Sequence, residues 1–159
     1  MALNDIRIVD TGGRNTIPTY TWVTAVTTLV AGDLVGATTG SPTAIIVVDG
    51  EGTTTQSYLG VVATPYDSVT GTVEVYMPLP GIIYETKATT STNVNTAAKI
   101  AALVGDAVTF DVSGTTITID ENAGHTATNA ALIVGGDPVR GTLKWMLRDS
   151  CTVLGHATV

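Results

Sequence analysis

Short runs of apolar and β-branched residues, separated by glycine, proline, serine or threonine, dominate the hydrophobic pattern of this chain. The alternating runs 71–77 and 141–147 predict strands with one buried face, because successive side chains of a strand point to opposite sides of its sheet. The continuous apolar runs 58–64 and 131–137 predict strands that are buried on both faces. Frequent threonine favours strands over helices. The pattern therefore predicts a mainly β fold.

One helix is expected within STNVNTAAKIAALVGD, residues 91–106. Thr92 or Asn93 can serve as its N-cap, and Gly105 ends the run. Small apolar residues recur at helical spacing, so we expect a narrow alanine face that packs closely over a sheet. The residues at this spacing are Val94, Ala97, Ala98, Ala101 and Ala102.

Two parts of the chain repeat the same order of features. Gly32-Asp33 and Gly105-Asp106 each precede a strand, a glycine turn and a second strand, and their offset in sequence number is 106 − 33 = 73. A unit of this size exposes its edges and has a thin core, but two units together can close both. We therefore predict an internal duplication, with units at about 29–80 and 102–150.

Two prolines strengthen this hypothesis. Pro65 and Pro138 have the same offset, 138 − 65 = 73, and each follows an apolar run that it is expected to end by removing a ladder donor. The Gly-Thr pairs at 71–72 and 141–142 have the smaller offset 141 − 71 = 70. This predicts that the second unit is three residues shorter in the loop after its proline.

The segment 1–20 differs from the rest and predicts an extended N-terminal arm, followed by a β domain at 21–159. Gly12-Gly13 and Pro18 interrupt a short alternating strand at Ile6 and Ile8. An arm without a partner in its own domain usually finds one outside it. The alternative is that Ile6 and Ile8 begin the protein's own sheet, and the sequence leaves both interpretations open.

Charge narrows the range of partners. The chain has 7 basic and 14 acidic residues, a net charge of −7 and a pI near 4.4. No lysine or arginine occurs between Arg14 and Lys87, so nearly half of the chain has no cation to neutralise phosphates. Acidity also disfavours anionic membranes, and no apolar run approaches the roughly 20 residues of a spanning helix. We expect a soluble protein that binds neither nucleic acid nor membrane.

The N-terminus lacks the basic flank and apolar block of a signal peptide, so the chain is expected to stay in the compartment where it is made. Its single cysteine, Cys151, cannot form an internal disulfide and is expected to be a small, partly buried apolar residue. His156 lies in a glycine-containing C-terminal tail and has no motif around it.

Candidate metal ligands are few. His125 follows Asp120 and Glu121, but Asp, Asn and Gly are the usual residues of a solvated turn, and the spacing matches no established cage. Asp49 and Glu51 do not match the alternating ligand pattern of a calcium loop. No serine or cysteine pairs with a histidine by motif, and no carboxylate pair indicates acid–base chemistry. We expect no cofactor, no metal and no catalytic residue.

The segments AGDLV (31–35), YLGVVAT (58–64) and GTVEVYMPLPGIIYE (71–85) resemble the capsid decoration, or cement, proteins of tailed bacteriophages, of the lambda decoration type. Residues 95–110 and 132–150 are similar to the C-terminal half of some of these proteins. The resemblance covers roughly residues 25 to 150. It implies a compact antiparallel β-sandwich or barrel-like domain of the β-tulip type. In this chain the domain would combine two related β units with one short helix.

This resemblance also implies a function. Such a structural virion protein is made in the host cytoplasm and binds the outer surface of the mature capsid. There it cements neighbouring subunits of the phage major capsid protein. A homo-oligomer is expected, with a trimer favoured and a dimer possible.

Contact residues can be proposed for this role. Ile6 and Ile8 could add a strand to a capsid edge, and nearby arginines could meet capsid carboxylates. Trp22 and Trp145 lie within alternating apolar patterns and are expected in the core. The candidate contact residues are Ile6, Arg7, Ile8, Arg14, Tyr20, Pro78 and Pro80.

Two other classes remain open. Another virion part, such as a head fibre base or a tail component, would share the composition but bind at few positions. A carbohydrate-binding β module would expose a platform of aromatic rings, and the eight aromatic residues here are scattered along the chain.

Overall fold

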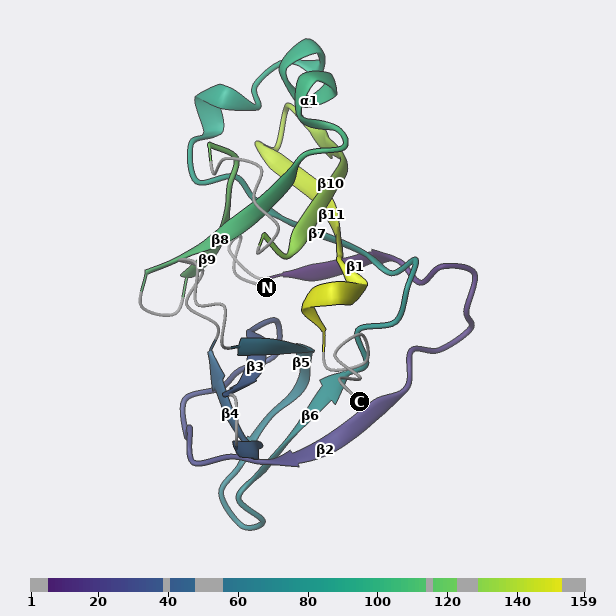
Figure 1. Cartoon of the computed structure of the whole chain (residues 1–159). Helices are drawn as coiled ribbons and strands as arrows, with labels where there is room; N and C mark the ends of the chain where they lie inside the picture. The colour runs from purple at the N-terminus through teal and green to yellow at the C-terminus, as the bar shows by residue number, and fades with distance from the viewer. Residues whose placement is uncertain (1–5, 39–40, 48–55, 114–115, 123–128, 153–159) are drawn as a thin grey trace.

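The computed structural model describes residues 6–38, 41–47, 56–113, 116–122 and 129–152. Within these residues the chain forms two antiparallel β-sheets with one α-helix and no closed barrel (Figure 1). The expected mainly β, sandwich-like fold is confirmed.

Sheet A lies in the upper half of Figure 1 and has six strands in the order β1-β7-β11-β10-β8-β9. These strands are β1 (Arg7–Asp10), β7 (Ile83–Lys87), β11 (Thr142–Leu147), β10 (Ala131–Asp137), β8 (Ala107–Ser113) and β9 (Thr116–Asp120).

Sheet B lies in the lower half and has five strands in the order β2-β6-β5-β3-β4. Its strands are β2 (Thr19–Val23), β6 (Thr72–Tyr76), β5 (Gln56–Asp67), β3 (Leu34–Thr38) and β4 (Ser41–Val47).

With β1 set aside, the two sheets have the same strand order. Strands β2, β6, β5, β3 and β4 of sheet B correspond in turn to β7, β11, β10, β8 and β9 of sheet A. The Gly-Asp turns that precede β3 and β8 also make the same backbone hydrogen bonds to β5 and β10. In sheet B, Gly32 N–H donates to the Val62 carbonyl, and Val62 N–H donates to the Asp33 carbonyl. In sheet A, Gly105 N–H donates to the Ile133 carbonyl, and Ile133 N–H donates to the Asp106 carbonyl. The four donor–acceptor distances are 2.8 to 2.9 Å.

The two prolines do not correspond. Asp67 and Asp137 begin the equivalent turns that follow β5 and β10, and their offset in sequence number is 137 − 67 = 70. At this offset, the residue equivalent to Pro138 is Ser68 and not Pro65. Pro65 lies inside β5, in an irregular stretch of its pairing where a missing donor is tolerated. The predicted shortening after the second proline is wrong, since both turns have the same length.

The N-terminal segment is part of the fold. Strand β1 pairs antiparallel with β7, and Ile6 is only 4% exposed within the main core. Of the two interpretations left open, the second holds: Ile8 lies in β1 of the protein's own sheet, and Ile6 immediately precedes this strand. The prediction of an arm at 1–20 that has no partner in its own domain is therefore wrong for Arg7–Asp10. Residues 1–5 lie outside the described residues.

The helix is shorter than predicted. Helix α1 spans Ala97–Leu103, and its N-cap is Thr96, whose hydroxyl accepts a hydrogen bond from Lys99 N–H at 3.3 Å. The expected caps Thr92 and Asn93 instead lie in the 3-10 turn η1 (Ser91–Asn93). The alanine face is exposed, contrary to prediction, because the single buried residue Ile100 makes the contact with β10. The exposed alanines are Ala97, Ala98, Ala101 and Ala102.

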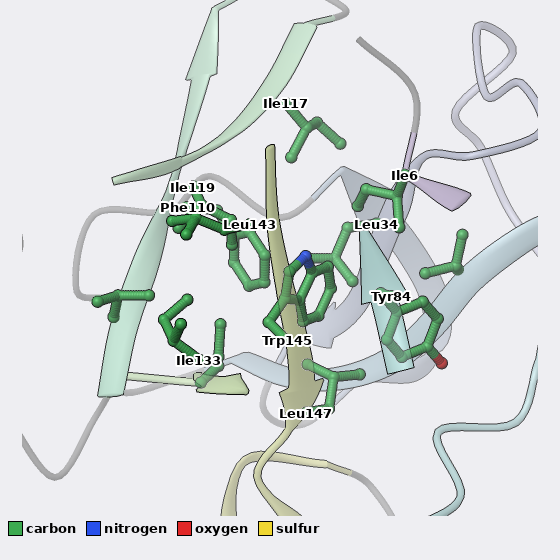
Figure 2. Packing of buried hydrophobic residues seen from close by; sticks show 14 of the residues in the cluster. Ile6, Leu34, Tyr84, Phe110, Ile117, Ile119, Ile133, Leu143, Trp145 and Leu147 are labelled. Atoms are coloured by element: carbon green, nitrogen blue, oxygen red, sulfur yellow. The ribbon is translucent and has the colours of Figure 1, made fainter. Parts of the chain in front are cut away.

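Aromatic rings form the centre of the main core. Figure 2 shows Trp145 on β11 between Phe110 and Tyr84, with ring centroids 4.8 Å away in both cases. The core position expected for Trp145 is confirmed, and its indole N–H donates to the Thr86 hydroxyl at 3.0 Å. The ring centroid of Tyr58, in sheet B, lies 5.9 Å from that of Phe110, in sheet A, so this aromatic contact joins the two sheets.

A second, smaller cluster fills sheet B. Trp22 packs against it but is only half-buried, so its expected place in the core is met in part. Cys151, in the 3-10 turn η2 (Asp149–Cys151), is a buried free thiol, as expected for a small apolar residue. The buried members of the second cluster are Leu29, Val35, Ala37, Leu59, Val62, Val73 and Val75.

Gly60 tests the packing of β5 against β6. It has a φ of +136°, and a Cβ at this position would lie 2.0 Å from the carbonyl oxygen of Tyr76. We expect Gly60→Ala to lower the free energy of unfolding by about 1–3 kcal/mol or more, measured by urea denaturation. Gly135→Ala is the matched control, because Gly135 has no such φ and no atom within 4 Å of a built Cβ. Equal stability of the two variants would contradict this packing.

Candidate functional site

Two turns share a sequence pattern and carry the most exposed large apolar residues among those described. The pattern Asp-x-Val-x-Gly-Thr occurs at 67–72, between β5 and β6, and at 137–142, between β10 and β11. Val69 is 90% exposed and Val139 is 94% exposed. The β5–β6 turn lies at the bottom of Figure 1, and the β10–β11 turn lies near α1 at the top. We call these turns the two tips.

Side-chain caps hold each tip in place. An oxygen of Asp67 accepts a hydrogen bond from Val69 N–H at 2.8 Å, and an oxygen of Asp137 accepts one from Val139 N–H at 2.9 Å. The bonds from Val69 N–H and the Thr70 hydroxyl lower the pKa of Asp67. The aspartates thus satisfy the backbone of each turn, as Asx turns do, and leave both valines in solvent.

Glycine completes both turns. Gly71 and Gly141 have φ values of +68° and +63°, in the left-handed region that favours glycine. The Gly71 carbonyl accepts a hydrogen bond at 3.0 Å from the N–H of Thr24, the residue after β2. The Gly141 carbonyl accepts one at 3.1 Å from the N–H of Ala88, the residue after β7. Three strands therefore fix each tip, so its valine is presented on rigid backbone.

Sequence reasoning missed both valines as candidate residues. The signal was present, because the spacing of Asp, Val, Gly and Thr is identical in the two turns. When the two units are aligned on their prolines, with an offset of 73, these turns do not coincide, and their shared pattern is hidden.

Arg7 meets a carboxylate of its own chain. Its Nε donates to Glu85 Oε2 at 3.0 Å and its Nη2 donates to the same oxygen. Thr142 donates to Oε1, and Arg140 Nη1 lies 3.6 Å from Oε1. Glu85 itself is 2% exposed. This buried carboxylate therefore links β1, β7, β11 and one tip.

Two opposing effects set the pKa of Glu85. Burial raises it, whereas the hydrogen bonds from Thr142 and Arg7 and the charges of Arg7 and Arg140 lower it. The second set prevails, and the pKa of Glu85 lies below its ordinary value. The carboxylate is consequently ionised at neutral pH.

A groove of about 540 Å³ lies between β1 and sheet B. Ile6 and Ile8 form one wall together with Arg7, whose side chain is partly exposed. The opposite wall comes from sheet B and the turn before β3, and is mostly apolar. Its residues are Ala31, Gly32, Val61, Val62, Ala63 and Tyr76.

The structure brings Arg14 together with the 78–81 loop. Arg14 Nη1 donates to the carbonyl of Pro80 at 3.0 Å and to that of Thr11 at 3.2 Å. Pro80 is exposed, whereas Pro78 is buried and so is not available for contact on the surface of the isolated chain.

Tyr20 stabilises sheet B. Its hydroxyl donates to the carbonyl of Leu59 at 2.6 Å, and its ring meets Trp22 edge-on at 5.1 Å. Burial raises the pKa of Tyr20 to about 12. The phenol therefore stays protonated and keeps this hydrogen bond at physiological pH.

The aromatic residues form no exposed platform in the described chain. Four are buried and the other four are half-buried, so none lies fully in solvent. This placement gives no support to the carbohydrate-binding alternative. The buried residues are Tyr58, Tyr84, Phe110 and Trp145, and the half-buried residues are Tyr20, Trp22, Tyr66 and Tyr76.

Within the described ranges, no three His, Cys, Asp or Glu side chains lie close enough to hold a metal ion. Asp120 caps Asn122 N–H at 3.0 Å, and Glu121 accepts from Asn93 at 2.9 Å, as side chains of a polar turn do. The remaining candidates, Asp49, Glu51, His125 and His156, lie outside the described residues. In the same ranges, no helix has the length and hydropathy needed to span a membrane.

Comparison with protein-family models, with curated proteins and with solved structures finds no match to this chain.

The pKa of Glu85 gives a test of its ion-pair network. Glu85→Gln should lower the free energy of unfolding by roughly 2 kcal/mol near neutral pH, because hydrogen bonds to a charged group are lost. A lowered folded-state pKa contributes stability above the ordinary value of 4.5, and this contribution disappears as the pH falls through the folded pKa. Urea denaturation over this acid range measures the difference between the two proteins.

Glu74→Gln serves as the control, since Glu74 is exposed and bonds only to Thr64 among the described contacts. It should change stability little at any pH. If the deficit of Glu85→Gln were the same at every pH, the charge of Glu85 would not be its source.

Proposed function

We propose that the protein is a structural virion protein that binds the outer surface of the mature phage capsid and cements neighbouring subunits of the major capsid protein. The observation that carries this proposal is the pair of tips, which present equivalent exposed valines at opposite ends of a rigid β body. The sequence resemblance of residues 25–150 to phage decoration proteins points to the same role.

The physical demands of cementing agree with these features. A cement protein needs two or more rigid contact points that reach different subunits, and here the tips are held by aspartate caps, glycines and three strands each. One valine contributes little affinity on its own. Engagement of both tips makes the second contact intramolecular, which can raise affinity by orders of magnitude.

Selectivity for the mature shell follows from the same geometry. The distance between the tips is fixed by the two packed sheets, so only one spacing of capsid sites can satisfy both. A protein that binds one state of the shell and not the other stabilises the bound state by mass action. Decoration would therefore make capsid expansion difficult to reverse.

The candidate contact residues fall into two groups under this proposal. Pro80 is exposed, and Arg7, Ile8, Arg14 and Tyr20 are partly exposed, so these remain candidates for capsid contact. Ile6 and Pro78 are buried and serve the fold of the chain itself.

Valine substitutions at the tips test the proposal. Val69→Ser and Val139→Ser should each weaken binding to expanded capsids roughly ten- to a hundredfold, since burial of one valine contributes about 1.5–3 kcal/mol. The double variant should lose more than either single variant because the bivalent gain disappears. Co-sedimentation with undecorated capsids, before and after expansion, measures the copies bound per shell at saturation.

Val30→Ser is a matched control, because Val30 is 47% exposed and lies outside both tips. It should bind like the unmodified protein. Saturation of expanded shells alone, at a fixed multiple of the capsid's symmetry sites, is the expected result. Binding at a handful of positions would instead favour a head fibre base or a tail component, and no binding would overturn a capsid partner.

A further inference from the structure

The two sheets carry opposite charges at one pair of equivalent positions, Lys144 in sheet A and Glu74 in sheet B. The face of sheet A formed by β1, β7, β11 and the β10–β11 turn holds four of the chain's seven basic residues around the buried Glu85, which pairs with two of them. Sheet B holds none, because no lysine or arginine lies between Arg14 and Lys87. The four basic residues are Arg7, Lys87, Arg140 and Lys144.

Strand register places these cations on one face. Arg7 and Lys144 are both the cross-strand partners of Glu85, so all three side chains lie on the same side of sheet A. Lys87 is two residues beyond Glu85 on the same strand and shares this side. Arg140 joins them through its contact with Glu85. We call this surface the basic face.

Sheet B has an equivalent surface. Alignment of the two turns matches Lys144 with Glu74 and Arg140 with Thr70. Glu74 is exposed, and its cross-strand partners Thr21 and Thr64 are exposed too. We call this surface, whose carboxylate is Glu74, the acidic face. It follows that one architecture presents a cation on one face and an anion at the same place on the other.

Each face also has an apolar part. On the acidic face, Val23 is 61% exposed and occupies the place of Lys87. On the basic face, Met146 and its cross-strand partner Leu132 are half-buried next to Lys144. Interfaces combine such apolar contacts with complementary charge around them.

We infer that the basic face of one copy of this chain binds the acidic face of a second copy. The two faces lie on different sheets, so the contact is heterologous and each copy keeps one face for a further neighbour. Such contacts close into a ring or extend into a chain, depending on the rotation between copies. This inference concerns the protein alone and does not depend on a capsid partner.

The first test is the oligomeric state of the purified protein. Sedimentation equilibrium over a wide range of concentrations should show self-association at low salt. Association should weaken strongly near 1 M salt, where the screening length falls to about 3 Å. A protein that stays monomeric at low salt and high concentration overturns the inference.

Charge reversal then locates the contact. Glu74→Lys and Lys144→Glu should each raise the dissociation constant roughly tenfold or more, because like charges would meet across the contact. An equimolar mixture of the two variants should associate again, since each then offers a face that complements the other. Failure of the mixture to recover would contradict the pairing of these two faces.

Asp111→Lys and Lys99→Glu are the matched controls. They make the same changes of charge at exposed positions on β8 and α1, away from Glu74 and Lys144. They should associate like the unmodified protein, and an effect as large as that of Glu74→Lys or Lys144→Glu would mean that net charge alone controls association. Lys144→Gln, with thermal unfolding as a check, removes the cation without placing a carboxylate beside Glu85, and it should still weaken association.

Discussion

The packing of sheet B against the core of sheet A is the constraint on which the rest of this structure depends. A five-stranded sheet with one apolar face cannot bury that face alone, and each half of this chain supplies five consecutive strands of one sheet, to which β1 adds a sixth strand in sheet A. Leu34, Tyr58 and Val61 of sheet B belong to the same cluster as Phe110 and Trp145 of sheet A. This shared cluster fixes the sheets relative to each other and therefore sets the separation and direction of the two tips.

The same architecture serves different purposes in the two halves. Equivalent turns keep the aspartate, the valine and the glycine, because the backbone of the turn requires the first and last of these. The equivalent positions Glu74 and Lys144 differ in charge, since side chains that reach solvent are not constrained by packing. Matching turns suit contact with equivalent sites on a shell, and complementary faces suit contact between copies. Both proposals place binding on surfaces that the sheets hold rigid.

The sequence predicted the larger part of the fold. Alternating and continuous apolar runs located β5, β6, β10 and β11, and the Gly-Asp pairs marked turns that make matching hydrogen bonds. Errors arose where a local signal had two meanings. Proline can end a strand or occupy an irregular stretch within it, and Pro65 does the latter. Alanines at helical spacing favour a helix, but they do not determine which side of it is covered.

The candidate site was predicted less well. The sequence pattern predicts Arg7, Arg14 and Ile8 as contact residues of an arm, but the fold brings Arg7 to Glu85, Arg14 to Pro80 and Ile8 to a groove wall. Glu85 cannot be predicted from the sequence, because nothing in the sequence near it shows that two arginines from distant parts of the chain surround it.

By itself, the sequence determined the β class, the repeated turns and the distribution of charge along the chain, since these depend on local pattern and composition. Only the tertiary structure decided that Ile6 is buried, that Glu85 is enclosed and that Val69 and Val139 stand in solvent. The physical reason is that burial and ion pairing depend on residues far apart in sequence, which only the pairing and packing of strands bring together.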